Sequence, residues 1–381
     1  MRQVIEHSGW IDAQHLSVCR VPAPTFRERA RARFLAEVFQ GLGHEPEIDA
    51  VGNVVVPIVS SQDLPYLAVT AHMDTALAPS GPEQIRVGPF GKLEGPGVTD
   101  NGAGLAALIA IARFVTGPLA RNPARNLLLV ANVGEEGEGD LRGIRHLVSE
   151  SAYKDRTDSY LVVDGSSLGH ITVSAIGSRR YELVIDGSGG HSWNDFGRAN
   201  PIHAVAQAVA RMSTARLPWR PKVTLSVGVI DGGSSVNAIP CRASAKIDIR
   251  SADPAGLATG ERIVKNAVAA AVAAENRVST EPLVRHCLEE IGNRPAAPPL
   301  EANPVAECVR AVDRHLRIRS SPESASTDAN IPLAAGIPAV AVGAGGEGGD
   351  AHSPHEWYNP AGRDLGLRRL ILAIAAMQQA S

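Results

Sequence analysis

Short apolar runs separated by polar segments dominate the chain, and four of them end close to acidic or histidine side chains. The runs that predict buried strands are residues 66–70, 126–131, 160–163 and 337–342. In the same order, the side chains that follow them are His72 with Asp74, Glu135 with Glu136, Asp164, and His352. A further acid, Asp100, precedes residues 102–109, a small and apolar stretch that predicts the start of a helix.

The positions of these polar groups favour a single site. Open α/β sheets bind ligands beyond the carboxyl ends of their strands, and four of the five groups lie there. A single His-x-Asp, Asp-Asn or Asp-Gly pair is most often a turn, and a Glu-Glu pair is most often surface. Here Glu135 and Glu136 lie in a glycine-rich run directly after an apolar strand, where glycine permits close approach to a ligand. The recurrence at successive strand ends therefore predicts a metal-binding hydrolase site.

A second pattern occupies the middle of the chain. Residues 180–186, 222–230, 243–250 and 281–289 predict strands, and residues 201–214 and 254–274 predict helices. Their order is β-α-β-β-α-β, which is the ferredoxin-like order. We therefore expect a discontinuous α/β catalytic domain, residues 1–177 and 291–381, into which a ferredoxin-like domain of residues 178–290 is inserted. Residues 292–299 read as the linker that returns to the catalytic domain.

Charge and composition narrow the setting. The net charge is −3 with no basic run, so we expect neither nucleic acid nor an acidic membrane surface as partner. The N-terminal residues lack the apolar core of a signal peptide, and no apolar run is long enough to span a bilayer. Four cysteines without a C-x-x-C pair predict reduced, buried thiols. These features favour a cytoplasmic protein.

The motifs together resemble the M20 metallopeptidases, which include aminoacylases, deacylases, carboxypeptidases and tripeptidases. The resemblance extends over nearly the whole chain and includes the segment Ser326-Thr327-Asp328-Ala329-Asn330. It implies a dinuclear-metal exopeptidase-like catalytic domain and a ferredoxin-like lid through which many members form dimers. We therefore expect two divalent ions, zinc first, with manganese or cobalt as alternatives, and a homodimer.

The resemblance also assigns roles to the residues at the strand ends. Asp100 would bridge the two ions, His72 and Asp164 would complete one, and Glu136 and His352 would complete the other. Glu135 would be the general base, and a water held between the ions would be the nucleophile. His355 competes with His352, but the family places its ligand four residues before a glutamate, which selects His352. Because alternate strand residues share a face, we expect the Asp74 carboxylate to accept the second N–H of His72.

Three residues of the insert complete the expected site. His191 lies in the glycine-rich segment 187–193, and the resemblance implies that it comes from the partner subunit to stabilise an oxyanion. Asn237 and Arg250 resemble substrate-binding positions. A guanidinium binds a carboxylate with two hydrogen bonds, so Arg250 suits a substrate with a free carboxylate.

The sequence thus predicts hydrolysis of an amide bond in a small peptide or an N-acyl amino acid. The Ser-Thr-Asp-Ala-Asn segment slightly favours a di- or tripeptide aminopeptidase over a deacylase or a carboxypeptidase. A non-catalytic, metal-stabilised binding protein is the alternative from another class, and Glu135 argues against it because a binding protein needs no general base. A serine hydrolase is excluded since no G-x-S-x-G stands at a strand–helix junction.

Overall fold

The computed structural model describes residues 6–117, 119 and 122–379, which form two compact units. Unit 1 comprises Met1–Ala175 and Pro299–Ser381, apart from the residues not described, and unit 2 comprises Ile176–Pro298. Unit 2 begins two residues before the insert expected from the sequence and ends eight residues after it. Residues 1–5, on which the expected lack of a signal peptide partly rests, lie outside the described residues.

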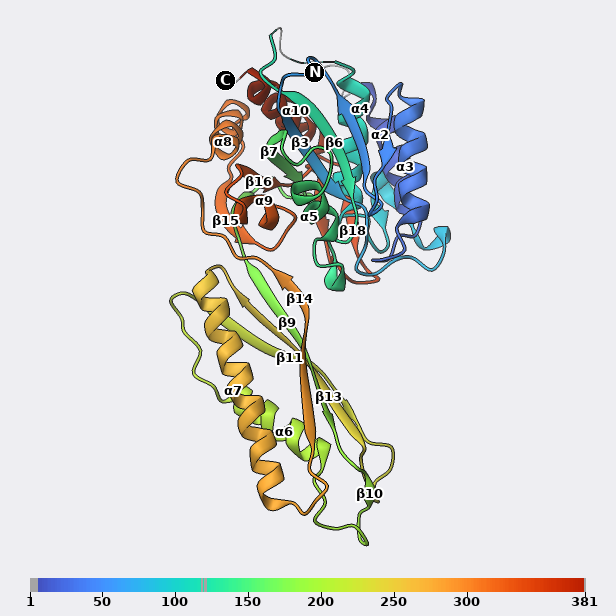
Figure 1. The fold of residues 1–381 in the computed structure, drawn as a ribbon. Coiled ribbons are helices and arrows are strands. Elements are labelled where there is room, and N and C mark those ends of the chain that lie inside the picture. The colour runs from blue at the N-terminus through green and yellow to red at the C-terminus, as the bar shows by residue number, and fades with distance from the viewer. Residues whose placement is uncertain (1–5, 118, 120–121, 380–381) are drawn as a thin grey trace. The chain divides into compact units, whose positions relative to one another are not determined.

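A mixed sheet of eight strands is the centre of unit 1 (Figure 1). Its strands, in spatial order, are β1 (Glu47–Ile48), β2 (Val54–Ile58), β6 (Asn126–Asn132), β3 (Tyr66–His72), β7 (Thr157–Val163), β16 (Ala339–Val342), β8 (His170–Ala175) and β15 (Ser321–Ala325). Neighbours from β6 to β16 run parallel, so their carboxyl ends meet at one edge of the sheet. All seven residues of β3 and of β6 are buried, as expected for parallel strands covered on both faces. The four strands predicted from apolar runs are therefore confirmed.

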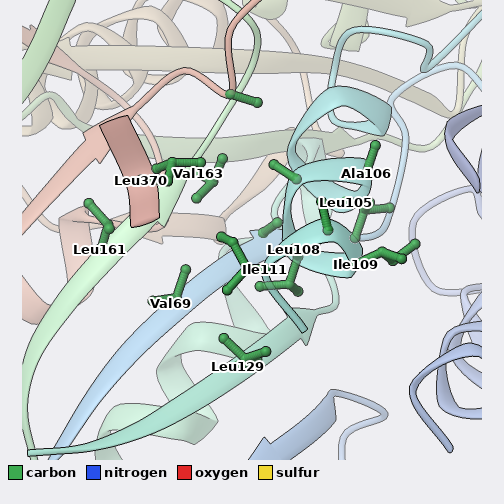
Figure 2. Close-up of a cluster of buried hydrophobic side chains, with 14 of the residues drawn as sticks. Val69, Leu105, Ala106, Leu108, Ile109, Ile111, Leu129, Leu161, Val163 and Leu370 are labelled. Carbon is green, nitrogen blue, oxygen red and sulfur yellow. The ribbon is translucent and has the colours of Figure 1, made fainter. Parts of the chain in front are cut away.

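Helices cover this sheet and supply the rest of the core. They are α2 (Ser8–Cys19), α3 (Arg29–Gly41), α4 (Gly102–Phe114), α5 (Arg142–Ser149), α8 (Pro304–Leu316), α9 (Asn330–Ala334) and α10 (Arg363–Gln379). Helix α4 begins where predicted, because the Asn101 side chain accepts the N–H of Gly104 at 3.1 Å and so caps its first turn. Figure 2 shows Leu108 and Ile111 of this helix facing apolar side chains such as Val69 and Leu129 of the sheet. This packing fixes Asp100 and Asn101 at the edge where the strands end.

A small antiparallel sheet completes unit 1. Its order is β17 (Glu347–Gly349), β18 (Trp357–Asn359), β5 (Leu93–Glu94) and β4 (Arg86–Val87). Short 3-10 turns occur at Pro82–Gln84, Pro89–Gly91 and Gly137–Gly139. The sheet pairs the segment before Asp100 with the segment after His352, which are far apart in the sequence.

Unit 2 has the ferredoxin-like arrangement that the sequence predicts. Its elements are β9 (Gly177–Asp186), β10 (Gly190–His191), α6 (Pro201–Ser213), β11 (Val223–Gly232), β12 (Ala238–Ile239), β13 (Arg242–Ser251), α7 (Pro254–Val278) and β14 (Arg285–Arg294). The antiparallel sheet has the order β11-β13-β9-β14, and β10 pairs with β12 in a separate ribbon. Alternate residues of β13 from Ala243 to Ile249 are buried, so one face of the sheet packs on the helices. Asn200 and Asp253 cap α6 and α7, and proline follows each cap.

Two expectations need correction. The last strand is Arg285–Arg294 rather than residues 281–289, so the first three residues of the expected linker continue a strand that pairs with β9. The four cysteines are free, but Cys241 and Cys287 are exposed, and only Cys19 is fully buried. Among the described residues, no helix is long and apolar enough to cross a membrane.

Candidate metal centre

His72 lies at the carboxyl end of β3, where its ring is buried beside two acids. Its Nε2 atom is 3.0 Å from Oδ1 of Asp100 and 3.8 Å from Oδ1 of Asp164. Asp164 directly follows β7, the strand paired with β3 on one side, so neighbouring strand ends place both groups. The first three candidate ligands therefore converge within unit 1.

His352 approaches the same aspartate from the opposite oxygen. Its Nε2 is 3.0 Å from Oδ2 of Asp100 and 3.0 Å from Oε1 of Glu136. Its backbone is in the left-handed region at φ 63°, which is uncommon for a residue other than glycine. The Asp100 carboxylate thus stands between two imidazoles, one on each oxygen, in the arrangement expected of a bridging ligand.

The donor set fits divalent metal ions. Ligand atoms of His72, Asp100 and Glu136 lie within 4.8 Å of one another. Oε1 of Glu136 is buried and lies 3.0 Å from Nε2 of His352, so this carboxylate adds negative charge to the cluster that a cation would offset. Imidazole nitrogens and carboxylate oxygens are ligands of zinc, and also of manganese and cobalt.

The electrostatics of the cluster favour positive charge at its centre. Hydrogen bonds to Asp100 and Glu136 raise the pKa of His352 to about 10, against the opposing effect of burial. Burial alone would lower the pKa of His72, but its acidic neighbours outweigh burial and hold that pKa well above its usual range. The pKa of Asp100 is lowered, because its bonds to the two histidines outweigh its own burial. The acids that raise the pKa of both histidines would stabilise divalent cations at the same place.

The Asp74 carboxylate accepts hydrogen bonds from the Glu135 segment and not, as expected, from the His72 ring. Its carboxylate accepts the backbone N–H groups of Glu135 and Glu136, each at 2.9 Å, and the Thr25 hydroxyl at 3.0 Å. The nearest acceptor for Nδ1 of His72 is the backbone carbonyl of Asp74 at 3.0 Å, while its carboxylate is 3.6 Å away. At 3.6 Å the Asp74 carboxylate and the His72 ring form an ion pair rather than the expected hydrogen bond, and the Asp74 carbonyl is the hydrogen-bond acceptor of Nδ1.

Glu356 was not singled out by the sequence as a functional residue. It is buried, and its carboxylate accepts the N–H groups of Gly97, Thr99 and Asp100 at 2.8, 2.7 and 2.8 Å. Burial raises the pKa of this carboxyl, although the three N–H groups oppose that rise. The one available signal was its place four residues after His352. Glu356 thereby ties the loop of one candidate ligand to the segment of the other.

The sequence analysis also did not predict that Asn132 and Asp328 form a buried, hydrogen-bonded pair. Asn132 ends β6 and donates to Oδ2 of Asp328 at 2.7 Å, and both side chains are buried. The carbonyl of Asn132 accepts the N–H of Met73, the residue after His72, at 2.7 Å. Burial raises the pKa of Asp328 to about 7. The Ser-Thr-Asp-Ala-Asn segment therefore contacts the end of β6, next to the end of β3 where His72 lies.

The three candidate residues of the insert divide into two places within unit 2. His191 and Asn237 lie together, because His191 pairs with Ala238 and the Asn237 carbonyl accepts the N–H of Ser192 at 3.0 Å. Arg250 is at the other end of β13, where its Nε donates to Asp248 at 2.7 Å. Arg250 lies eight positions along β13 from Arg242, which is beside the His191 ribbon, and this is roughly 27 Å of strand.

The fold and this cluster define an α/β protein with a candidate metal site and a ferredoxin-like insert, and comparisons with known proteins agree. A sequence model of the Peptidase family M20/M25/M40 matches residues 68–376, so the chain belongs to this family of hydrolytic enzymes.

Individual relatives are more distant. A probable carboxypeptidase of Aspergillus oryzae is 25% identical over 283 residues, covering 71% of this chain and 63% of that protein. A succinyl-diaminopimelate desuccinylase of Gluconacetobacter diazotrophicus is 27% identical over 202 residues, covering 49% of this chain and 51% of that protein. The chain thus matches about half to two thirds of the length of these curated relatives. The crystal structure of a Staphylococcus aureus tripeptidase has the same fold, with a TM-score of 0.75, 21% identity, and coverage of 97% of this chain and 98% of that one.

Proposed function

We propose that this protein hydrolyses an amide bond in a small peptide or an N-acyl amino acid that carries a free carboxylate. The observation that carries the proposal is the Asp100 carboxylate held between His72 and His352, with Glu135 on the adjoining loop. A purely structural cluster of this kind would have no use for a second glutamate beside the ligand Glu136. The family to which the chain belongs supports a hydrolytic role.

Five side chains of unit 1 would hold two divalent ions. Asp100 would bridge them, His72 and Asp164 would complete one, and Glu136 and His352 would complete the other. When bound, such ions would lower the pKa of a water molecule to near neutrality and polarise the amide carbonyl. The burial of His72 and Glu136 keeps most bulk water from their ligand atoms, which strengthens the electrostatic effects there.

Glu135 would move the proton. It is buried, and its backbone N–H is fixed by the Asp74 carboxylate, so its position is set by the same residue that adjoins His72. It would accept a proton from the attacking water at a carboxylate oxygen and deliver it to the leaving amine. General acid–base catalysis of this kind typically contributes about 10²–10⁴ to the rate.

His191 would donate a hydrogen bond to the oxyanion that forms. Its Nδ1 accepts the backbone N–H of Trp193 at 3.2 Å, so in the neutral ring Nε2 carries the proton and is a donor. Asn237, next to it, has its Oδ1 occupied by the Ser235 hydroxyl at 2.6 Å, which leaves its amide N–H groups for a substrate. Arg250 would bind the substrate carboxylate.

A homodimer would allow Arg250 and His191 to bind the same substrate. Arg250 and His191 of one unit 2 are too far apart to bind the same small substrate, so two copies would have to contribute them. The edge strand β11 supports this arrangement, because its residues 228–232 are exposed although Val229 and Ile230 are apolar. An exposed apolar edge strand is a surface on which another chain can pair.

The choice of substrate is the finer part of the proposal. The resemblance of the Ser-Thr-Asp-Ala-Asn segment and the tripeptidase fold favour a di- or tripeptide aminopeptidase. The names of the two sequence relatives support a carboxypeptidase or a deacylase as the second candidate.

A substrate panel separates these activities. Protein loaded with zinc, manganese or cobalt is offered di- and tripeptides, N-acetyl amino acids, and peptides blocked at the amino terminus. Release of the first residue only from peptides with free amino termini would establish an aminopeptidase. Cleavage of blocked peptides at the carboxyl end would establish a carboxypeptidase, and release of acetate a deacylase. If none of these substrates is hydrolysed while two ions are bound, the proposed function is overturned.

A further inference from the structure

A groove of about 600 Å³ lies on unit 1 beside the segment that carries Glu135 and Glu136. Val133, two residues before Glu135, forms part of its wall, and Arg142, the first residue of α5, forms another part. Ala32, Ile48 and the largely exposed ring of Phe26 make the rest of the lining partly apolar. The groove is separate from the candidate metal ligands, none of which lines it.

Arginine side chains give the groove its charge. Arg29, Arg33 and Arg142 line it against two acids, Glu28 and Asp49. Glu28 is buried and accepts Nη2 of Arg142 at 2.6 Å, and Asp49 accepts three backbone N–H groups of residues 51–53. Among the described residues, Arg29 and Arg33 make no ion pair. The acids are thus already engaged, while two guanidinium groups are available to a ligand.

One helix N-terminus adds to this preference for negative charge. Helix α3 begins at Arg29 without a side-chain cap for its first N–H groups, whereas the Gly143 N–H at the start of α5 already donates to the Val133 carbonyl at 2.9 Å. Uncapped N-termini carry partial positive charge and bind anions. Independently, Nε of Arg142 is buried without a hydrogen-bond partner, an unusual state for a donor on a charged group.

The groove is mechanically linked to the metal centre through Arg142. The Arg142 side chain packs on Gly134, where an added Cβ would lie only 2.6 Å from its Cγ. Between Glu136 and Arg142, Asp140 and Leu141 have left-handed backbones, with φ of 51° and 63°. Such backbone is costly for these residues and persists only where its surroundings hold it in place. A ligand that engages Arg142 would therefore act on the segment that positions Glu135.

We propose that this groove binds a small organic anion, one carboxylate joined to an apolar group, and that binding restrains the segment from Gly134 to Arg142. Arg29, Arg33 and the N-terminus of α3 would bind the carboxylate. Phe26, Ile48 and Val133 would contact the apolar part. The site is distinct from the proposed substrate site and does not depend on which amide is hydrolysed.

Calorimetric titration of the metal-loaded protein with phenylacetate tests the binding. Phenylacetamide lacks the charge and acetate lacks the apolar group, so both should bind at least about tenfold more weakly. Arg33→Glu, which changes an exposed side chain of the groove, should weaken phenylacetate binding about tenfold, and Arg29→Glu should do the same. The matched control is Arg310→Glu on α8, outside the groove, which should leave affinity unchanged.

Hydrogen–deuterium exchange of the same samples tests the link to the metal centre without any assay of hydrolysis. Phenylacetate should slow exchange in peptides covering residues 134–142 in the wild type and not in Arg33→Glu. Binding that is equal in Arg33→Glu and in the wild type would place phenylacetate elsewhere, such as at the metal ions, and overturn the proposal. Absence of binding, or binding without a change in exchange at 134–142, would also overturn it.

Discussion

In unit 1, side chains from several separate strand ends converge on Asp100. In unit 2, Arg250 lies at one end of the four-stranded sheet, and His191 and Asn237 lie in the β10–β12 ribbon beyond its other end. Parallel strands bring their carboxyl ends together, so the topology of a single chain assembles the candidate metal centre. The antiparallel sheet of the insert instead separates Arg250 from His191 by the length of a strand. The proposal therefore has one chain hold the candidate metal ligands and two chains contribute the residues that bind a small substrate.

The largest effect is expected at the centre itself, from Glu135→Gln. This change removes the proton acceptor but keeps the backbone bond to Asp74, so both ions should stay bound while kcat falls by about 10²–10⁴. Metal content and steady-state kinetics measure the two quantities. Glu138→Gln, an exposed glutamate of the same loop, is the control and should retain normal turnover. Near-normal kcat in Glu135→Gln would remove its proposed role.

A mixing experiment tests whether unit 2 acts across two chains. His191→Ala alone should lose about 10²–10³ in kcat through loss of an oxyanion donor. Mixing it with Glu135→Gln should restore about a quarter of wild-type activity, because half of the random dimers would contain one intact site. His203→Ala, an exposed histidine of the same unit, should stay fully active alone. Failure to regain activity in dimers shown to exchange subunits would contradict the shared site.

Glu356→Gln tests whether the hydrogen bonds that Glu356 accepts from the Asp100 loop contribute to metal affinity. A glutamine in this place directs an N–H₂ group at one of the three N–H donors and so loosens the Asp100 loop. The dissociation constant of the metal should rise about 10–100-fold, as measured by competition with a chelating dye. The exposed Glu347→Gln should bind metal normally. If the affinity were unchanged, the carboxylate would have only a packing role.

The smallest effect concerns stability and the buried Asp328. Its pKa of about 7 lies above the ordinary value, so the folded chain retains a proton that the unfolded chain loses at lower pH. Metal-free wild type should therefore lose stability as pH rises from about 4 to 7, by up to about 1.4 kcal/mol for each pH unit. Asp328→Asn, which can still accept from Asn132, should not show this loss in urea unfolding, whereas the exposed Asp63→Asn should behave like wild type. Parallel pH profiles for all three proteins would contradict the assignment.

The sequence predicts the two regions unequally well. Apolar runs followed by acids or histidines predicted β3, β6, β7 and β16 and the residues that gather at their ends. The prediction succeeded because a parallel sheet brings the carboxyl ends of its strands to one edge. The supporting contacts were not predictable in the same way. Glu356 and the Asn132–Asp328 pair act through backbone amides and buried partners more than 190 residues away, which no local pattern encodes. The start of β14 was misplaced since strand propensity does not reveal where pairing with β9 begins.

The most direct test of the central claim is the metal content of the purified protein. Mass spectrometry of the wild type should find two divalent ions per chain. Asp100→Ala should lose both, because its carboxylate lies against both histidines, while His352→Ala should retain one. Amide hydrolysis should disappear on chelation and return with the ions. A wild type that binds no divalent ion when these are supplied, or that hydrolyses amides equally well after chelation, would contradict the account.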